Sequence, residues 1–289
     1  LSFGIAQGVD FVALSFVRTA KDIEMLRALI TKQKGKQAIV AKIETQEAVE
    51  HIDDIIAATD AVMVARGDLA VEIGPERVPI VQKMIIRKCN EIGKPVIVAT
   101  QMLESMIHSP VPTRAEVSDV ANAIFDGTDA VMLSEETALG SYAREAVTVM
   151  SDVALQIERD IGTHRRHKVH NDSIVDSVSS SVVHNAEDVG AKVIVALTET
   201  GSTPRVIARY KPQQPIIVVT SHEHTARKAA LVYGCFPIVS SIFTGSKQVV
   251  MSLAPLLKKE GIIEKGDRMV VTAGVPFGKA GTTNMMMIL

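Results

Sequence analysis

Short runs of apolar, mostly β-branched residues recur along the chain and are separated by amphipathic stretches. In the first half these runs occupy residues 9–16, 37–44, 60–66, 94–101 and 129–136. Apolar runs of this length, bounded by polar or turn-forming residues, are typical of strands that are buried on both faces. The pattern therefore predicts five β-strands in this half of the chain.

Apolar positions between the predicted strands recur with helical spacing. Residues 20–33 ("AKDIEMLRALITKQ") and 79–93 ("PIVQKMIIRKCNEIG") are the clearest examples. The second stretch ends at Gly93, which suits a left-handed helix C-cap, and Pro95 follows it. Strands that alternate with helices in this way predict an α/β fold with a parallel sheet covered by helices, either a β/α barrel or an open sheet.

The second half repeats the alternation after a polar interruption. A predicted helix at 142–160 leads into residues 161–173, "IGTHRRHKVHNDS", whose turn-forming and polar residues indicate a boundary between domains at 1–160 and 161–289. Beyond it, strands are predicted at 191–198, 215–221, 236–241, 267–274 and 284–289, and helices at 173–189, from Pro204 onward, at 223–233 and at 246–260. We expect a second α/β domain with a five-stranded, mostly parallel sheet.

Composition narrows the class of protein. With 289 residues and a formal net charge of -2, the chain is long enough for two domains, and nucleic acid is not an expected partner. The Arg and His residues of the stretch at 161–173 could form a nucleic-acid patch, but without interleaved aromatic residues we interpret them as a solvated linker. No apolar run approaches the roughly 20 residues that a membrane-spanning helix needs, and the N-terminus lacks the order of a signal peptide. Cys89 and Cys235 lie far apart and are expected to be reduced core thiols. We therefore expect a cytoplasmic protein, and because the chain begins at Leu1 we expect a piece of a longer one.

Polar residues that could bind ligands or take part in catalysis follow successive strands of the first half. Lys42 and Glu44 are two positions apart and share one face, Asp68 follows the next strand, and Thr100 and Gln101 follow the one after. The carboxyl ends of parallel strands meet at one edge of a sheet or one mouth of a barrel. We therefore expect these side chains to surround one cleft.

This set of residues suits a divalent cation beside an anionic substrate. Glu44 and Asp68 offer the oxygen ligands that Mg²⁺ or Mn²⁺ prefers, and Lys42 can neutralise charge that develops during a reaction. Gly67 permits close approach of the backbone, so the amides of Gly67 and Asp68 could hold a carboxylate or phosphate. The alternative is a surface salt-bridge set formed by Lys42, Glu44 and Asp68.

The second half has a candidate phosphate site in "LTETGSTPRV". The loop contains Thr198, Thr200, Gly201, Ser202 and Thr203 ahead of a predicted helix with Pro204 at its first position. Hydroxyl groups and free amides would then face a bound anion. An ordinary helix capped by Thr203 is the alternative.

Two other features receive structural interpretations. His222 and His224 could suggest a metal pair, but we place both in the first turn of a helix capped by Ser221. The run from Met285 to Met287 is interpreted as the buried part of the last strand.

Longer motifs bring a family resemblance. The segments "AKIETQEAV", "VMVARGDLAVEI", "PVIVATQMLESMI", "PTRAEVSDVANAIFDGTDAVMLSEETALGSY" and "AGVPFGKAGTTN" closely resemble pyruvate kinase, and the resemblance spans essentially the whole chain. That family transfers the phosphoryl group of phosphoenolpyruvate to ADP in the final step of glycolysis, through a Mg-bound enolate. The resemblance implies a TIM-type β/α barrel, of which this chain would hold five of eight strands, followed by a separate α/β domain that binds effectors and contributes to oligomerisation.

The resemblance also implies roles for the residues at the strand ends. Lys42 would be the cation beside the transferred phosphoryl group, and Glu44 and Asp68 would bind the metal. The amides of Gly67 and Asp68 would hold the substrate carboxylate, and Thr100 would contact the substrate where the enolate takes its proton. These roles agree with the chemistry expected from the residues themselves, since phosphoryl transfer depends mainly on positioning and charge neutralisation.

Further implications concern the next strand end and the assembly. Ser134 and Glu136 could order water in a proton relay, or they could simply cap local structure. The loop at residues 198–203, with help from residues 275–284, would bind a phosphorylated effector, either a sugar phosphate or a nucleotide monophosphate. The family usually forms homotetramers and uses K⁺. The potassium ligands, the lid domain and much of the ATP/ADP site belong to the N-terminal part of the family, which has no counterpart in these residues.

The sequence departs from the family pattern at single positions and, more seriously, in strand number, because the family barrel has eight strands and we predict five. The family usually has a small residue at the position of Glu135, and often Lys and Pro at those of Leu139 and Ala143. Because five strands cannot close an eight-stranded barrel, we expect little or no turnover from the chain alone. Two other functions fit the pattern: a metal-dependent, enolate-forming lyase or aldolase of the barrels that handle phosphoenolpyruvate, and a non-catalytic remnant that binds a phosphorylated ligand.

Overall fold

The computed structural model describes residues 1–161, 173–240, 246–275 and 283–289, with the side chains of residues 161 and 246–250 left out. The chain divides into two compact units, Leu1–His164 and Arg165–Leu289, and each is described by itself. The predicted boundary stretch at 161–173 lies almost entirely outside the described residues.

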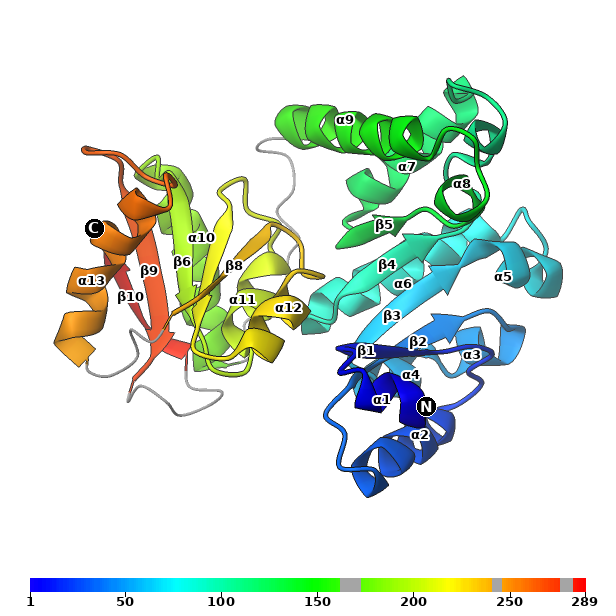
Figure 1. Cartoon of the computed structure of the whole chain (residues 1–289), viewed down its shortest axis with the longest axis horizontal. Coiled ribbons are helices and arrows are strands. Elements are labelled where there is room, and N and C mark those ends of the chain that lie inside the picture. The colour runs from blue at the N-terminus through cyan, green and yellow to red at the C-terminus, as the bar shows by residue number, and fades with distance from the viewer. Residues whose placement is uncertain (162–172, 241–245, 276–282) are drawn as a thin grey trace. The chain divides into compact units, whose positions relative to one another are not determined.

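The first unit is built on a sheet of five parallel strands (Figure 1). The strands are β1 (Phe11–Leu14), β2 (Ala38–Ile43), β3 (Ala61–Ala65), β4 (Val96–Ala99) and β5 (Ala130–Met132), and each pairs with the next along the chain. Strand order that follows chain order is the order of a β/α barrel, whereas doubly wound sheets reverse it. The five predicted strands and the barrel-type order are therefore confirmed.

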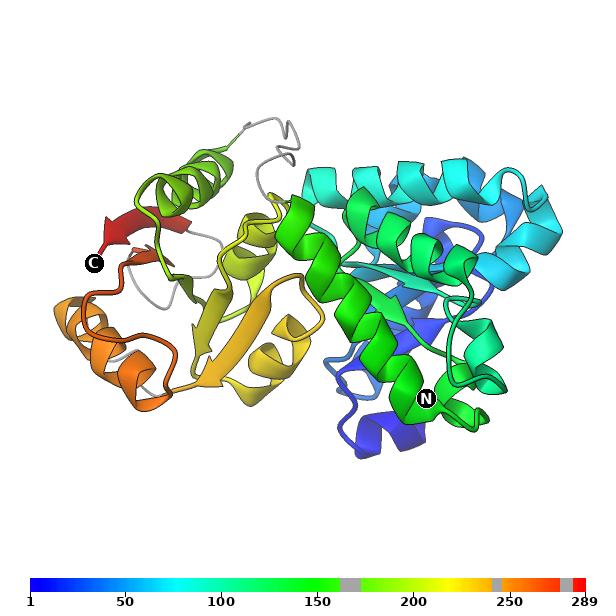
Figure 2. The ribbon, with the colours of Figure 1, turned by 90° about the horizontal axis from the view of Figure 1, so that it is seen from above.

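Helices connect these strands and cover one face of the sheet (Figure 2). They are α1 (Ser2–Ala6), α2 (Ala20–Lys32), α3 (Gln46–Glu50), α4 (Ile52–Ala58), α5 (Arg66–Ile73), α6 (Val78–Ile92), the 3₁₀ helix η1 (Glu104–Ile107), α7 (Arg114–Asp126), α8 (Glu135–Ala138) and α9 (Ala143–Ile161). Helix α6 ends at Gly93 with φ of 70°, as its sequence predicts.

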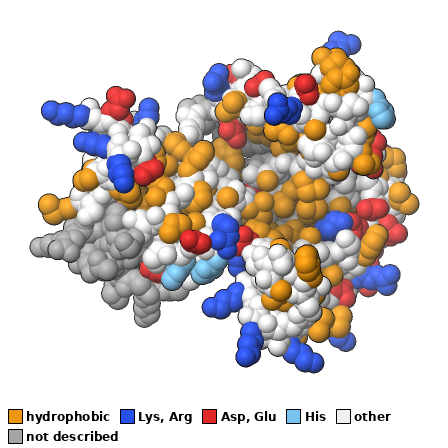
Figure 3. Space-filling view, in the orientation of Figure 1, with side chains coloured by type: hydrophobic (Ala, Val, Ile, Leu, Met, Phe, Trp, Pro, Cys, Tyr) orange, Lys and Arg blue, Asp and Glu red, His pale blue; other side chains and the backbone are white. Residues whose placement is uncertain are grey.

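The two faces of the first sheet have different surroundings. Ile39, Ala41 and Ile43 of β2 belong to the hydrophobic core that the helices share, whereas Val40 and Lys42 lie on the opposite face. That opposite face is hollowed, and the side chains around the hollow are mainly hydrophobic (Figure 3). Lys42 therefore points away from the helix-packed core and toward the open side of the sheet.

All five predicted strands of the first unit end earlier than expected, and the reason is clearest for β3, β4 and β5. Strand β4 ends at Ala99 because Thr100 and Gln101 have positive φ angles of 69° and 54°. The expected strand at 129–136 ends at Met132, and helix α8 occupies residues that we had placed in the strand. Arg66, expected as the last residue of β3, is the first residue of α5. In each case the strand is replaced by a tight turn or a helix start at the edge where polar residues gather.

The second unit has a five-stranded sheet in the order β10-β9-β6-β7-β8. Its strands are β6 (Val193–Leu197), β7 (Ile216–Thr220), β8 (Cys235–Val239), β9 (Met269–Gly274) and β10 (Thr283–Ile288), and its helices are α10 (Ile174–Asp188), α11 (Ser202–Ala208), α12 (Glu223–Ala229) and α13 (Ser246–Lys259). β10 is antiparallel to β9, and the other pairs are parallel. The expected mostly parallel sheet is confirmed.

Both faces of this second sheet are covered. Ile194 and Ala196 of β6 pack in a core with α10, α11 and α12, while Val193 and Val195 pack in a core with α13. A strand that is buried on both faces reads as a continuous apolar run, which explains why "KVIVAL" shows no alternation.

Details at the helix starts differ from the sequence predictions. Helix α11 begins at Ser202 after Gly201, which has φ of 81°, so Pro204 is its third residue and Thr203 is not its N-cap. Helix α12 begins after His222, without a side-chain cap, and ends at Ala229. Ser221 therefore does not cap it. A glycine in the left-handed region turns the chain earlier than the proline signal suggested.

The methionine run lies in β10 as predicted, but it is buried unevenly. Met285 and Met286 are partly buried and pack against opposite faces of the sheet, whereas Met287 is 37% exposed. The last strand is an edge strand, so its outward side chains keep contact with solvent.

A capping box fixes the segment that follows β4. Glu116, in the first turn of α7, accepts hydrogen bonds from the backbone and hydroxyl of Thr113 at 2.7 and 2.8 Å and from the backbone and hydroxyl of Ser105 at 2.7 and 2.6 Å. Burial raises the pKa of Glu116, but these hydrogen bonds outweigh burial and hold the pKa below its ordinary value. One carboxylate thus joins η1 to the start of α7.

Replacing Glu116 with Gln should remove a pH-dependent part of the stability. Because the folded pKa is lowered from 4.5, the ionised carboxylate stabilises the fold above that pH, and this contribution is lost as pH falls through the folded pKa. We expect Glu116→Gln to lower the free energy of unfolding by about 1–3 kcal/mol at pH 7 and to flatten its fall in acid. Urea unfolding at several pH values measures both effects, with the exposed Glu104→Gln as control. An unchanged acid slope in Glu116→Gln would contradict the account.

Gly140 is required by close packing between α8 and η1. A Cβ atom at this position would lie 2.4 Å from the carbonyl oxygen of Glu136 and 3.2 Å from the Cα atom of Ile107. We expect Gly140→Ala to lower the free energy of unfolding by about 1–3 kcal/mol. In the control Gly4→Ala the nearest atom would be 3.6 Å away, so stability should stay the same or rise slightly. Equal unfolding midpoints for the two variants would refute this.

Candidate functional site

A lysine and a glutamate form a close ion pair at the carboxyl end of β2. Lys42 Nζ lies 2.6 Å from Glu44 Oε1 and donates a hydrogen bond to Ser15 Oγ at 2.9 Å. The Glu44 side chain is completely buried, and its Oε2 accepts a hydrogen bond from the Phe16 amide at 2.6 Å. The lysine side chain keeps 25% of its surface exposed. The ammonium group is therefore held in place by its neighbours while remaining open to a ligand.

The buried Glu44 carboxylate is only partly satisfied. Its Oε1 oxygen contacts the lysine but has no hydrogen bond of acceptable geometry among the described residues. A buried carboxylate oxygen normally has partners for its lone pairs. The Oε1 atom thus retains capacity for a ligand.

A second pair lies at the ends of β3 and β4. The Gly67 amide donates a hydrogen bond to Thr100 Oγ1 at 2.9 Å, and this hydroxyl donates to the Ala99 carbonyl at 2.6 Å. A Cβ atom on Gly67 would be 3.7 Å from the nearest atom, Thr100 Oγ1, so the chain itself does not require glycine here. Asp68 follows as an exposed residue in the first turn of α5, whose N-cap Ala65 provides no side-chain cap. The positive end of this helix is available to an anion.

Strand register places the two pairs at neighbouring positions on one edge. Ile43 of β2 is paired with Val64 of β3, and Val64 is paired with Val98 of β4. The residues that follow these three strands therefore leave the sheet at the same level. Within the described part of the chain, neither Lys42 nor Glu44 forms an ion pair or hydrogen bond with Asp68. The salt-bridge alternative is thus limited to the Lys42–Glu44 pair.

Glu136, which follows β5, binds backbone amides on both of its carboxylate oxygens. Glu136 is buried and accepts hydrogen bonds from the Ser134 amide at 2.7 Å and the Leu103 amide at 3.1 Å. Both carboxylate oxygens are thus engaged with backbone, and they tie the end of β5 to the segment after β4. Glu135 and Leu139, two positions that depart from the family pattern, are exposed.

Arg66 is a residue that sequence reasoning assigned no role. It is buried, donates hydrogen bonds to the carbonyl groups of Thr100 and Gln101, and pairs with Asp119. A charged residue inside an apolar run was the available signal, because a buried guanidinium must find partners. Its partners could not be read from the sequence, since they lie 34 to 53 positions away.

The oxygen atoms at this edge fit a hard divalent cation. Glu44 contributes a buried carboxylate whose Oε1 is paired with Lys42, and Asp68 contributes an exposed carboxylate. Among the described residues no group of three His, Cys, Asp or Glu side chains converges as a metal site. Two carboxylates that leave other positions to substrate oxygens and water suit Mg²⁺ or Mn²⁺ in a phosphoryl-transfer site.

The hydroxyl loop of the second unit is more enclosed than its sequence suggests. Thr198 is buried and accepts a hydrogen bond from the Gly201 amide at 2.9 Å, and the buried Thr203 shares a hydrogen bond of 2.8 Å with Thr283. Thr200 Oγ1 donates to Ser202 Oγ at 3.2 Å. The hydroxyl groups of Thr200 and Ser202 are therefore the ones left for an anion. The companion loop lies largely outside the described residues.

His222 and His224 lie next to this loop. Their rings are 5.4 Å apart, and His222 Nε2 lies 2.9 Å from Glu199 Oε2, which also accepts a hydrogen bond from Ser221 at 3.1 Å. Ser221 thus contacts a carboxylate instead of capping α12. These contacts join the loop before α11, which contains Glu199, to the start of α12.

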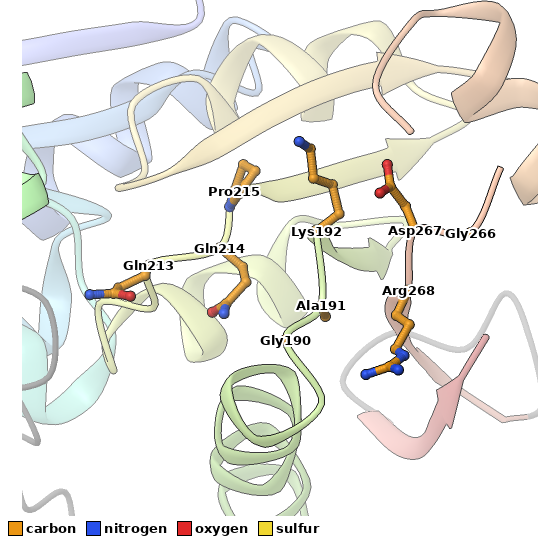
Figure 4. A pocket seen from close by; sticks show the side chains of 9 residues that line it. All are labelled: Gly190, Ala191, Lys192, Gln213, Gln214, Pro215, Gly266, Asp267 and Arg268. Carbon is orange, nitrogen blue, oxygen red and sulfur yellow. The ribbon is translucent and has the colours of Figure 1, made fainter. Parts of the chain in front are cut away.

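A pocket of about 390 Å³ lies at the amino ends of β6, β7 and β9 (Figure 4). The residues that line it are Gly190, Ala191, Lys192, Gln213, Gln214, Pro215, Gly266, Asp267 and Arg268. Lys192 and Asp267 point to the same side, whereas Arg268 points away and donates a hydrogen bond to the Val189 carbonyl at 2.7 Å. The hydroxyl loop follows the carboxyl end of β6, so this pocket lies at the opposite end of the sheet. Ligands of parallel sheets usually bind outside the carboxyl ends of the strands, not at the amino ends.

Two further observations concern the helices and the cysteines. In the part of the chain that the structure describes, no helix combines the length and apolar character needed to cross a bilayer. Cys89 and Cys235 are buried free thiols.

Comparison with known proteins places both units in one family. A family model described as the pyruvate kinase barrel domain matches residues 1–147, and one described as the pyruvate kinase alpha/beta domain matches residues 176–289. Pyruvate kinases of Sporosarcina psychrophila and Geobacillus stearothermophilus are each 48% identical over 292 residues, covering 99% of this chain and 50% of theirs. The crystal structure of a pyruvate kinase from Cryptosporidium parvum matches with a TM-score of 0.92 and 41% identity, covering 99% of this chain and 59% of that one. The chain spans about half the length of these curated relatives, and it belongs to the pyruvate kinase family.

Proposed function

We propose that this chain supplies the Lys42, Glu44, Asp68 and Thr100 side of the active site in a protein that transfers a phosphoryl group between phosphoenolpyruvate and ADP, giving pyruvate and ATP. The observation that carries the proposal is the Lys42–Glu44 pair at the end of β2, in which a completely buried carboxylate holds a partly exposed ammonium at 2.6 Å. Family membership supports the reaction class.

Lys42 acts on the transferred group. Its ammonium is held by Glu44 and Ser15 at 2.6 and 2.9 Å, and it is still partly exposed. A fixed positive charge stabilises the negative charge that is spread over the phosphoryl oxygens in the transition state. A charge that its neighbours hold in position needs little reorganisation during reaction.

Glu44 and Asp68 would hold the divalent cation, Mg²⁺ or Mn²⁺. When bound, such an ion polarises substrate oxygens and neutralises their charge. The two carboxylates leave the remaining coordination positions open. A K⁺ requirement belongs to the same proposal, with ligands outside this chain.

The start of α5 would bind the substrate carboxylate. The amides of Gly67 and Asp68 lie at the positive end of the helix, and the missing Cβ of Gly67 leaves room for close approach. The Gly67 amide now contacts the Thr100 hydroxyl, which places that hydroxyl beside the same subsite. We place Thr100 at the face where the enolate takes its proton, and Ser134 as a group that orders water nearby, with Glu136 fixing its backbone.

The second unit would bind a phosphorylated effector at the loop of Thr198, Thr200, Gly201, Ser202 and Thr203. Support comes from the match of this unit to the pyruvate kinase alpha/beta domain and from the outward hydroxyl groups of Thr200 and Ser202. The same proposal includes an oligomerisation role for this unit, a homotetramer for the complete protein and a cytoplasmic location. The last agrees with the two free thiols.

The chain alone should show little or no pyruvate formation. Its five strands have two open edges, and contacts to ADP are proposed to come from a preceding segment. Fusing the part of the G. stearothermophilus pyruvate kinase that precedes its aligned segment should restore phosphoryl transfer from phosphoenolpyruvate to ADP, measured as pyruvate formation.

The outcomes of this fusion separate the alternatives. Normal rates from the unfused chain would overturn the incomplete-site account. A fusion that cleaves or condenses the substrate without transferring phosphate to ADP would favour a lyase or aldolase. An inactive, folded fusion that still binds a phosphorylated ligand would favour the non-catalytic remnant.

In the active fusion, Lys42→Met should lower kcat by about 10²–10³-fold, because a preorganised charge is lost from the transition state. The KM for phosphoenolpyruvate should change much less. Lys83→Met is the control, since Lys83 is an exposed lysine of the same unit that also pairs with a carboxylate, that of Asp126. Equal kcat values for the two variants would exclude the proposed role of Lys42.

A further inference from the structure

Thr100 and Gln101 adopt an unusual backbone conformation. Their φ angles are 69° and 54°, in the left-handed region that favours glycine. Threonine is β-branched, and among the described residues it is the one β-branched residue with positive φ. Such conformations persist where surrounding contacts enforce them, and they concentrate at functional sites.

The enforcing contacts come from Arg66. Its Nη2 donates to the Thr100 carbonyl at 2.8 Å and to the Gln101 carbonyl at 3.1 Å, and its Nε donates to the Thr100 carbonyl at 3.2 Å. Its Nη1 lies 2.6 Å from Asp119 Oδ2 and 2.8 Å from Oδ1. The guanidinium side chain is only 9% exposed. The planar guanidinium therefore donates to two backbone carbonyl groups along one edge and pairs with the Asp119 carboxylate along the other.

The residue after Arg66 completes the hold on Thr100. The Gly67 amide donates to Thr100 Oγ1, while Arg66 engages the Thr100 carbonyl. Two consecutive residues at the start of α5 therefore fix both the backbone and the hydroxyl of the same threonine. Lysine could not reproduce this, because its ammonium has no rigid fork.

We propose that Arg66, anchored by Asp119, is a positioning residue that holds Thr100 in its left-handed conformation and so aims the Thr100 hydroxyl at the substrate subsite. Arg66 touches neither substrate nor metal in this proposal and acts through Thr100. The conformational part rests on the geometry alone. The catalytic consequence rests on the function proposed above.

The conformational part is tested in the 289-residue chain without turnover. We expect Arg66→Lys to move the ¹³Cα and ¹³Cβ chemical shifts of Thr100 and Gln101 from left-handed toward extended values and to shift the Gly67 amide proton. Asp119→Asn, which keeps the guanidinium but weakens its anchor, should produce smaller changes in the same direction. General loss of stability would not move native-state shifts at these positions alone.

Arg27 provides a matched control. It also pairs with an aspartate, Asp60 at 3.0 Å, and donates to one carbonyl, that of Ala58 at 2.9 Å. Neither Asp60 nor Ala58 has a positive φ angle. Arg27→Lys should therefore leave the shifts of Thr100 and Gln101 unchanged. Unchanged shifts in Arg66→Lys as well would overturn the proposal.

The catalytic part is tested in the active fusion by separating two steps. In deuterium oxide, a C3 proton of pyruvate is removed and replaced by a solvent deuteron, and the loss of the methyl signal gives the rate. We expect Arg66→Lys to lower this exchange about 100-fold and to lower phosphoryl transfer about tenfold or less. An equal fall in both rates would show a general structural defect and contradict the positioning role.

The two proposals fail in different ways. A wild-type fusion without phosphoryl transfer would refute the proposed function, while the chemical shifts would still decide whether Arg66 sets the conformation of Thr100. An active fusion in which Arg66→Lys leaves both rates and shifts unchanged would refute the positioning role alone.

Discussion

The parallel register of β2, β3 and β4 is the constraint on which the candidate site depends. Because Ile43, Val64 and Val98 are paired across the sheet, the three chains leave it at one level, and the residues that follow are brought to one edge. Backbone hydrogen bonds set this register, and the helix-packed side chains stabilise it. A shift of one residue would turn Lys42 into the hydrophobic core and a core residue toward the open face.

Polar side chains at this edge are organised by one another and by backbone groups. Glu44 holds Lys42, the Phe16 amide binds Glu44, Arg66 binds the carbonyl groups of Thr100 and Gln101, and Glu136 binds the Leu103 amide. Each buried charge has a partner, as desolvation requires. The Oε1 oxygen of Glu44 is paired with the Lys42 ammonium at 2.6 Å and has no further partner among the described residues. The side chains at this edge are therefore held in place by their neighbours, while the Lys42 ammonium stays partly exposed.

The second unit also has polar residues after the carboxyl ends of its parallel strands, but of a different kind. Its sheet is covered on both faces, and the loop after β6 contains several hydroxyl groups and one carboxylate, Glu199, but no lysine. Hydroxyl and amide donors suit binding of a phosphate more than chemistry upon it. The two units thus have related architectures, and the residues after their strands distinguish them.

The sequence alone determined the elements and the candidate catalytic residues. Apolar periodicity located the ten strands that the described residues form and the main helices, and Gly93 marked the end of α6, because these signals act within a few residues. Strand ends also identified Lys42, Glu44, Asp68 and Thr100, since parallel strands present their carboxyl ends together. Tertiary structure decided what local signals could not: the early end of β5, the start of α11 at Ser202 and the role of Arg66. Arg66 contacts Asp119 across 53 positions, and only the folded sheet places that partner beside it.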